Sequence, residues 1–248
     1  MSSFYDNYHT DVVKTKKQNG LIDKSNFTYK NFFRYILPQI SDFKKKCSIL
    51  DIGSGAGTIS LFLAKQGYDV VGIDISQKAV EVSIQSAEEL NLETKVSFLN
   101  TDFKKFDCKR KFDVTICLEV IEHYKEDEKL LIKVHDLLKD NGLLILSTPL
   151  RTAPLQKLRL VSSFDRRVGH LRRYTKEEIA SKVDNSGFKV EKLIETEGVI
   201  RNCFYVFPFL GFVIRFIRGI IIDVVTKIDD ISGKLFGYSD LIVIARKK

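Results

Sequence analysis

The chain has 248 residues, of which 44% are hydrophobic and 29% are charged, so its composition excludes a disordered chain and allows one large buried core. A net charge of +8 is compatible with RNA, an anionic membrane surface or an acidic substrate, and it does not choose among them. The four cysteines form no C-x-x-C pair, which argues against a zinc ribbon and for a reducing compartment. Because the N-terminus MSSFYDNYHTDVVKTKK has no apolar signal-peptide core, we expect a cytoplasmic protein.

The N-terminal residues 1–45 are predicted to be a helical segment on the substrate side, with an apolar stripe that places a helix at 24–40. Short apolar strands then alternate with helices over 46–248, which predicts an α/β domain with a mostly parallel sheet and helices on both faces. The last two strands lack a regular crossover helix, so we expect a hairpin with an antiparallel edge. The predicted strands are 48–53, 68–76, 95–103, 112–120, 143–149, 188–196 and 240–248, and the predicted helices are 58–67, 77–92, 126–142 and 175–187.

An apolar insertion at about 198–238 interrupts this alternation, and its most apolar part is 203–225. Pro208, Arg215 and Arg218 break the run, so it is a poor membrane span. Such an insertion can form a substrate lid, a dimer face, a segment in the membrane interface or a helical hairpin packed on the domain's own core. All four interpretations stay open, and the third would make the protein peripheral on a membrane.

A glycine-rich loop, DIGSGAG, follows the first predicted strand and opens a helix. Gly53, Gly55 and Gly57 let the backbone turn tightly and pass close to a ligand. The spacing G-x-G-x-G differs from the G-x-G-x-x-G of the dinucleotide fingerprint, and Asp51 precedes the first glycine by two positions. A carboxylate there suits a cationic ligand and repels a pyrophosphate, which argues against a nicotinamide dehydrogenase.

Further acidic residues follow the second and third predicted strands. Asp74 ends the second strand, where a carboxylate can accept hydrogen bonds from ribose hydroxyls. Asp102 can meet an adenine amino group, with Phe103 packing on the ring. Each residue taken alone is also a common loop cap or turn former. Together they converge on the sheet edge where such folds bind ligands.

The series DIGSGAG, GIDIS, NTDF, FDVTICLEVIEHY and LLILSTP resembles the motifs of class I S-adenosylmethionine (SAM)-dependent methyltransferases over about residues 47–150. The resemblance implies a Rossmann-like seven-stranded sheet with an antiparallel last strand and SAM as the cofactor. The implied cofactor contacts are Asp51, Gly53, Gly55 and Gly57 for the methionine part, Asp74 for the ribose, Ile75, Asp102 and Phe103 for the adenine, and Leu118.

A cluster of carboxylates and histidine follows the fourth predicted strand, at the edge that faces the reactive methyl group in this architecture. Glu119, Glu122 and His123 lie within five residues. Such a set can bind a hard divalent ion, for which Mg²⁺ is the natural candidate. Alternatively, His123 is a general base that takes a proton from a substrate hydroxyl, or it merely packs against the backbone.

The run E-x-x-E-H is similar to that of ubiquinone-biosynthesis O-methyltransferases and of small-RNA 2′-O-methyltransferases. This resemblance associates Glu119, Glu122 and His123 with Mg²⁺. The RNA family adds a second histidine before an aromatic-Thr helix start, which His170 matches loosely, so the predicted catalytic residues are His123, Glu119 and His170. Four arginines flank His170 and could hold a substrate phosphate or carboxylate, or form a solvated face: Arg166, Arg167, Arg172 and Arg173.

We therefore expect an enzyme that moves a methyl group from SAM to an oxygen of a small-molecule, lipid-like or glycan acceptor. An RNA 2′-hydroxyl is the alternative acceptor, because the net charge favours RNA although no RNA-binding module is recognisable. A non-catalytic SAM-binding protein is a second alternative, against which the intact motif residues argue. The oligomeric state stays open.

Overall fold

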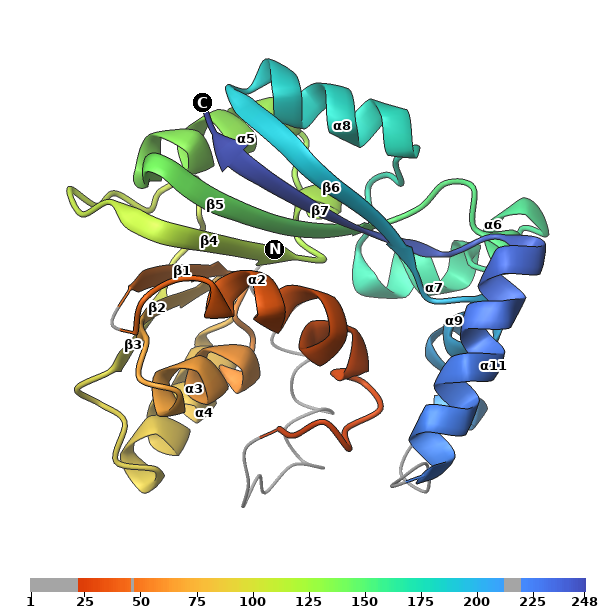
Figure 1. Cartoon of the computed structure of the whole chain (residues 1–248), viewed down its shortest axis with the longest axis horizontal. Coiled ribbons are helices and arrows are strands. Elements are labelled where there is room, and N and C mark those ends of the chain that lie inside the picture. Colours follow the sequence, from red (N-terminus) through yellow and green to blue (C-terminus); the bar gives the residue numbers. More distant parts are fainter. Residues whose placement is uncertain (1–21, 46, 212–219) are drawn as a thin grey trace.

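A seven-stranded sheet forms the centre of the computed structural model, which describes residues 22–45, 47–211 and 220–248 (Figure 1). The strand order is β3-β2-β1-β4-β5-β7-β6, and the first five strands in this order run parallel. The strands are β1 (Ser48–Ile52), β2 (Asp69–Asp74), β3 (Val96–Asn100), β4 (Phe112–Leu118), β5 (Leu138–Pro149), β6 (Phe188–Thr196) and β7 (Asp240–Lys247).

The last strand, β7, lies between β5 and β6 and is antiparallel to both. The predicted Rossmann-like sheet with an antiparallel last strand is therefore confirmed. The predicted antiparallel edge is also confirmed, because β6 forms the edge and pairs antiparallel with β7, which is internal. The burial of the two strands explains this order: residues 241–245 are all buried and need a partner on each side, whereas β6 exposes charged side chains such as Lys189 and Glu191.

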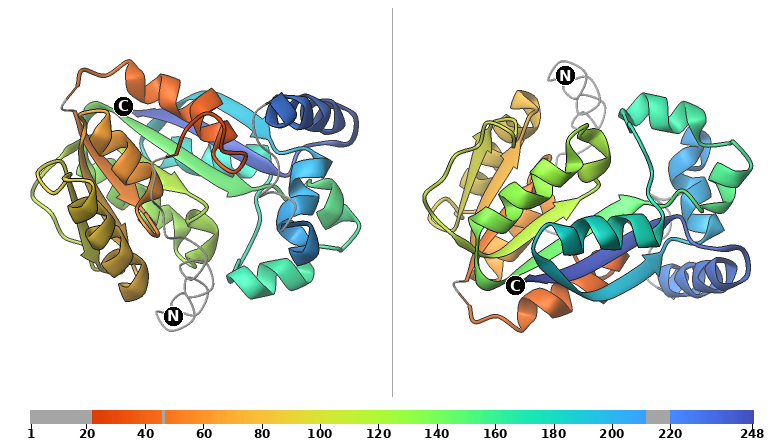
Figure 2. Two further views of the ribbon diagram at one scale, coloured as in Figure 1. Left: turned by 90° about the horizontal axis from the view of Figure 1, so that it is seen from below. Right: turned by 90° about the horizontal axis from the view of Figure 1, so that it is seen from above.

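Helices cover both faces of the sheet (Figures 1 and 2). Neighbouring residues of β1 point to opposite faces, so that Ile49 packs in the core with Leu61 of α3, and Leu50 packs in the core with Leu131 of α5. The helices on one face are α2 (Leu37–Ser41), α3 (Thr58–Lys65) and α4 (Gln77–Glu89), and those on the other are α5 (Asp127–Leu137) and α8 (Lys176–Asn185).

The N-terminal helix is shorter and less regular than the one predicted at 24–40. It consists of a π-helix, η1 (Phe32–Ile36), followed directly by α2. Pro38 at the start of α2 has no N–H to donate into the preceding turn, and a wider turn there accommodates the missing hydrogen bond.

The helix predicted at 126–142 is also wrong at its end. α5 stops at Leu137, and Leu138 already pairs with Phe112 of β4. A register shift follows before Leu143 pairs with Val114. Pairing with β4 therefore outcompetes the helical tendency of this stretch, and the local sequence does not reveal this pairing.

The apolar insertion forms helices at one end of the sheet (Figure 2). α9 packs against α11, and Arg201 Nε lies 3.8 Å from Asp229 Oδ2 between them, with both side chains buried. Residues 212–219 of the predicted apolar run lie outside the described residues. Within the described ranges, the helices lack the combination of length and apolar character that a membrane crossing requires. The helices at this end are α6 (Pro154–Lys157), α7 (Ser162–Val168), α9 (Val199–Val206), α10 (Pro208–Gly211) and α11 (Ile220–Phe236).

Two glycines with positive φ provide a matched test of packing. At Gly57 (φ +72°) an added Cβ would lie 2.6 Å from the ring of Phe98 and 2.8 Å from Cβ of Ser83, whereas at Gly67 (φ +97°) it would meet nothing within 4 Å. We expect Gly57→Ala to lower the free energy of unfolding by about 2–4 kcal/mol and Gly67→Ala by about 1 kcal/mol. Urea denaturation followed by circular dichroism measures both losses, and equal losses would contradict tight packing at Gly57.

Candidate active site

A cavity of about 610 Å³ opens at the carboxyl ends of the parallel strands. This is the edge at which open α/β sheets bind ligands. The N-terminal helical segment, α7 and α9 complete its walls, so the cavity joins parts of the chain far apart in sequence. The predicted site residues that line it are Gly53, Gly55, Asp74, Ile75, Asp102, Phe103, Leu118, Glu119, His123 and His170.

The glycine loop connects β1 to α3 through left-handed turns. Gly53, Gly55 and Gly57 have φ of +72°, +54° and +72°. Gly53 and Gly55 line the cavity, and a side chain at Gly53 would overlap Val120. Gly57 does not line the cavity but precedes α3 and packs against Phe98. Two of the three predicted glycines are therefore placed to meet a ligand directly.

The Asp74 carboxylate fastens this loop to the start of α4. Oδ2 accepts a hydrogen bond from the backbone N–H of Gly55, and Oδ1 accepts one from the N–H of Ser76, each at 2.8 Å. Ser76 Oγ in turn accepts from Ala79 N at 3.2 Å as the N-cap of α4. Each oxygen of Asp74 keeps a further lone pair for a ligand.

Asp102 and Phe103 follow β3 in a short turn. Asp102 Oδ1 accepts hydrogen bonds from the N–H of Lys104 at 3.0 Å and from the hydroxyl of Tyr124 at 3.2 Å. Phe103 is buried, and both residues line the cavity together with Ile75. An aromatic ring beside a fixed carboxylate is a suitable arrangement for a purine base with an exocyclic amino group.

Asp51 lies within β1, below the glycine loop, and does not line the cavity. Its Oδ2 accepts a hydrogen bond from Ser60 Oγ at 2.6 Å. Burial raises the pKa of Asp51 to about 7, although the bond from Ser60 works against this rise. Asp51, for which the motif implies a cofactor contact, is thus a buried carboxylate next to the loop.

Glu119 follows β4 in a left-handed conformation, with φ of +54°. Ser147 Oγ donates to Glu119 Oε1 at 2.5 Å, and the backbone N–H of Glu119 donates to the carbonyl of Ser147 at 3.2 Å. A non-glycine residue held in this conformation stores strain, which is common at functional sites. Glu119 lines the cavity next to Leu118.

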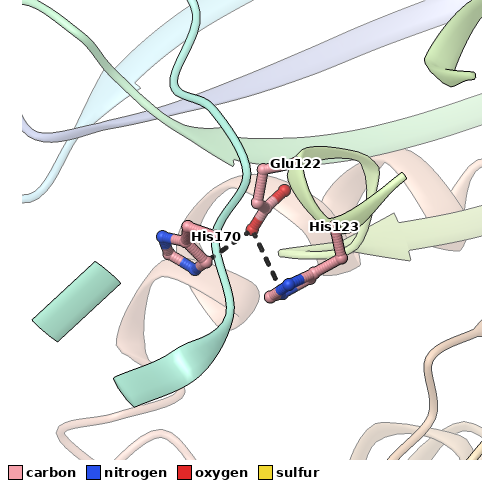
Figure 3. Close-up of side chains that lie close together, drawn as sticks. All are labelled: Glu122, His123 and His170. Atoms are coloured by element: carbon pink, nitrogen blue, oxygen red, sulfur yellow. Dashed lines mark ion pairs between the residues drawn. The ribbon is translucent and has the colours of Figure 1, made fainter. Parts of the chain in front are cut away.

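Glu122, His123 and His170 meet beside the cavity (Figure 3). The first two belong to the 3₁₀-helix η2 (Ile121–His123), and His170 follows α7. Glu122 Oε1 lies 3.6 Å from His170 Nε2 and 3.9 Å from His123 Nε2. Glu119 is not part of this cluster, so the structure brings together three of the four predicted metal ligands.

Hydrogen bonds on the far side of each imidazole orient this cluster. His123 Nδ1 lies 3.0 Å from the carbonyl oxygen of Gly169, and His170 Nδ1 lies 3.0 Å from Asp165 Oδ1. Because both partners are acceptors, each Nδ1 carries a proton. Burial lowers the pKa of His123 and raises that of Glu122 well above its usual value, so the neutral forms are favoured.

Glu122 Oε2 accepts from Thr148 Oγ1 at 3.2 Å, whereas its buried Oε1 has no hydrogen-bond partner among the described residues. When Glu122 is ionised, this oxygen and the Nε2 atom of His170 are therefore two acceptors that face each other. Such an arrangement requires a proton or a cation between them.

The arginines near His170 are mostly engaged within the protein. Arg173 pairs with Asp165 at 2.6 Å, and Arg172 pairs with Asp127 at 2.9 Å. Arg167 and Arg173 line the cavity, whereas Arg166 and Arg172 do not. The predicted anion-binding cluster is thus partly a set of internal ion pairs.

Several lining residues carried no recognisable motif in the sequence. Asp165, which orients His170, lies on α7, and its spacing of five residues from the histidine is a signal only in retrospect. Asp165 itself does not line the cavity, whereas Glu197, Asn202 and Asp240 do, and these three come from the strands and the connection at the far end of the chain. Their convergence depends on the internal position of β7.

Comparison with known proteins agrees with this fold. A family model described as a methyltransferase domain matches residues 27–193. The ubiquinone biosynthesis O-methyltransferase of Rickettsia conorii is 36% identical over 122 residues, which cover 47% of this chain and 42% of that protein. That of Rickettsia bellii is 28% identical over 179 residues, 68% of this chain and 72% of that protein. The chain thus spans less than half the length of the first relative.

Among solved structures, magnesium protoporphyrin IX methyltransferase from Synechocystis with bound S-adenosylhomocysteine (SAH) superposes with a TM-score of 0.68 at 19% identity, over 100% of this chain and 98% of that chain. This likeness shows the shared fold. The family model covers more than half of the chain, and the motif resemblance stated from the sequence is confirmed. The chain therefore belongs to the methyltransferase-domain family, as the class I motifs of its sequence indicated.

Proposed function

We propose that this methyltransferase transfers the methyl group of SAM to an oxygen of a small-molecule acceptor. The observation that carries the proposal is one cavity lined both by the glycine loop with Asp74 and by His123. The same cavity has aromatic walls from Tyr29, Phe32 and Tyr205, which suit a small acceptor with an apolar body.

The residues at the end of the cavity formed by the glycine loop fit SAM. Gly53 and Gly55 offer backbone at close approach, and Asp74 keeps lone pairs for the ribose hydroxyls. Ile75, Asp102 and Phe103 would hold the adenine, and Leu118 would pack beside the cofactor. When bound, SAM supplies an electrophilic methyl group on a sulfonium, and the protein contributes mainly position and orientation.

Asp51 is proposed to act on the cofactor through its charge rather than by contact. It is buried directly before the loop, where a carboxylate is poorly solvated and a nearby ammonium group stabilises its ionised form. Gly57 supports the loop through packing alone.

His123 is proposed to take the proton of the acceptor hydroxyl. Its Nδ1 proton is held by the Gly169 carbonyl, and burial keeps the ring neutral at physiological pH. A neutral imidazole in the cavity is a suitable general base. Glu119 and His170 are proposed to position the acceptor and the base, because both line the same cavity.

The residues around Glu122 also fit a divalent ion. Glu122, His123 and His170 would be its ligands, with the orphaned Oε1 of Glu122 as the oxygen donor. An ion held there would act as a Lewis acid that polarises the acceptor hydroxyl. Two imidazoles and one carboxylate suit Zn²⁺ or Fe²⁺ better than the Mg²⁺ expected from the motif.

The acceptor class can be tested by comparing three probes. An alkylated catechol represents the acceptors of ubiquinone-pathway relatives, and a porphyrin propionate represents those of the porphyrin enzyme. A short RNA with a free 3′ end represents the RNA alternative, which the net charge of +8 left open. We expect SAH release with a small-molecule probe. Turnover with RNA alone, at a rate that falls steeply with salt, would contradict a small-molecule acceptor.

Asp51 makes a pH-dependent prediction for cofactor binding. Burial raises the pKa of the Asp51 carboxyl group to about 7 in the free protein, and the ammonium group that SAM and SAH share favours the ionised form, so binding releases a proton below this pH. We expect the affinity for SAH to rise about 3–10-fold from pH 6 to pH 8. Calorimetry should show this rise in the wild type and a flat profile in Asp51→Asn. The same slope in both proteins would exclude Asp51 as its cause.

The ion site makes a separate prediction. We expect His170→Ala to lose Zn²⁺ binding in equilibrium dialysis and to lower kcat about 10–100-fold, with the SAH affinity unchanged. His135→Ala, which changes a histidine on α5 outside the cavity, is the matched control. If His170→Ala retains stoichiometric metal, His170 is not a ligand of the ion. If chelator-treated wild type keeps its full kcat, the ion plays no part and His123 acts alone.

A further inference from the structure

The helix α11 exposes apolar side chains to solvent, which reverses the usual arrangement of a surface helix. Its exposed face carries five apolar residues at alternating intervals of three and four, which places them in one row along the helix: Ile221, Val224, Ile228, Ile231 and Leu235. These five residues are called the apolar stripe below, and their exposed fractions lie between 48% and 70%. Single exposed apolar side chains are ordinary, whereas a continuous row of them is typical of an interaction surface.

The opposite face of α11 is buried and largely polar. Asp229 accepts hydrogen bonds from the backbone N–H groups of Gly198 and Arg201, at 2.9 and 2.8 Å. Ser232 Oγ accepts one from the N–H of Val199 at 3.0 Å. These donors belong to the first turn of α9, where a helix has no partners of its own for them. Because α11 caps α9 in this way, it cannot turn the apolar stripe inward without leaving these donors unpaired.

The acidic residues next to the exposed face are neutralised by the N-terminal segment. Asp223 Oδ1 lies 2.6 Å from Lys30 Nζ. About two helical turns further on, Asp230 Oδ2 lies 2.7 Å from Arg34 Nη1. Both acids therefore add no net charge to this side of α11.

Two lysines border the apolar stripe. Lys227 lies three residues after Val224, and Lys234 lies three residues after Ile231, so both project along the same edge of the stripe. Both are exposed, and neither makes a hydrogen bond or an ion pair with a residue that the structure describes. A lysine side chain can lie along an apolar surface while its ammonium group meets an anion. The exposed face of α11 is therefore apolar in the middle and positive along one edge.

A second copy of the chain fits this face poorly. Stable protein interfaces bury about 800 Å² per partner and involve about 20–30 residues a side. The apolar stripe offers only five side chains on a single helix. The same face of a second copy would also bring no free carboxylate to the two lysines, because the acids beside the stripe are already paired.

An anionic membrane surface matches both properties of this face. Apolar side chains of an exposed helix bury at the boundary between headgroups and acyl chains, and lysines beside them bind the anionic headgroups. We propose that the exposed face of α11 binds an anionic lipid bilayer, with the apolar stripe in the headgroup boundary and Lys227 and Lys234 at the lipid phosphates. This inference goes beyond the proposed methyl transfer, because it assigns the enzyme a place at a membrane whatever its acceptor is.

The position of α11 connects this surface with the cavity. α11 packs against α9, and α9 contributes Asn202 and Tyr205 to the cavity wall. Figure 1 shows α11 at the outer end of the molecule, beside α9. A bilayer bound to α11 would therefore be separated from the cavity by a single helix, which suits an acceptor with an apolar body that partitions into the bilayer.

Vesicle sedimentation with the full chain tests the surface. Two kinds of vesicle are compared, one of phosphatidylcholine alone and one of equal parts of phosphatidylcholine and phosphatidylglycerol. We expect the wild type to partition onto the anionic vesicles at least about tenfold more strongly than onto the neutral ones, and this binding should weaken as the salt concentration rises. Equal partitioning onto both, or binding to neither, overturns the proposal.

Two double variants separate the apolar and the electrostatic contributions. Ile228→Gln with Ile231→Gln should lower the partition coefficient about tenfold or more, because two apolar side chains no longer leave water. Lys227→Gln with Lys234→Gln should lower it about 10–30-fold, since each cation near an anionic surface contributes about fivefold. All four residues are exposed, so the circular dichroism spectrum and the SAH affinity should stay those of the wild type.

Matched controls come from exposed residues outside α11. Ile84 on α4 and Ile132 on α5 are 41% and 50% exposed, and Lys65 and Lys109 are exposed as well. Replacing the two isoleucines by Gln, or the two lysines by Gln, should keep the partition coefficient within about threefold of the wild type.

Two further results would contradict the proposal. If the α11 variants bind anionic vesicles as strongly as the control variants do, the bilayer contacts another surface. If the wild type ignores vesicles and sediments as a dimer that Ile228→Gln with Ile231→Gln dissociates, a second copy of the chain covers the apolar stripe instead of a membrane.

Discussion

The site depends on one anchored carboxylate. Asp74 receives the backbone N–H groups of Gly55 and Ser76 and so joins the loop after β1 to the start of α4. Without this bridge, a loop made of left-handed glycines would lose conformational order, because glycine resists fixation more than any other residue. The same residue lines the cavity, so a structural restraint and a predicted ligand contact are combined in one side chain.

Two regions at the cavity hold polar groups in unfavourable arrangements. Around Glu122, the imidazoles have their Nδ1 protons directed outward to Gly169 and Asp165, which leaves acceptor atoms facing inward. Around Glu197 and Asp240, carboxylates line the cavity close enough to raise one another's pKa, and Arg201 only partly offsets the charge of Glu197. Both regions hold destabilising arrangements that a ligand can relieve, a common feature of functional sites.

The sequence predicted the parts of the fold that depend on local pattern. The first strand, the glycine loop around Gly53 and the helix that follows it are all present. The internal place of β7 and the end of α5 at Leu137 were not predictable, because both follow from pairing between distant strands. For the same reason, the motifs pointed to residues such as Asp74 and His123, whereas Glu197, Asn202 and Asp240 were missed.

The place of β7 between two earlier strands has a consequence for biogenesis. During synthesis β5 and β6 leave the ribosome before β7, and each presents an unpaired edge for as long as residues 240–247 are missing. Apolar residues such as Leu144 and Ile145 of β5 are then open to edge-to-edge association. From this strand order we expect C-terminal truncations to aggregate, and Asp240 joins the cavity wall last.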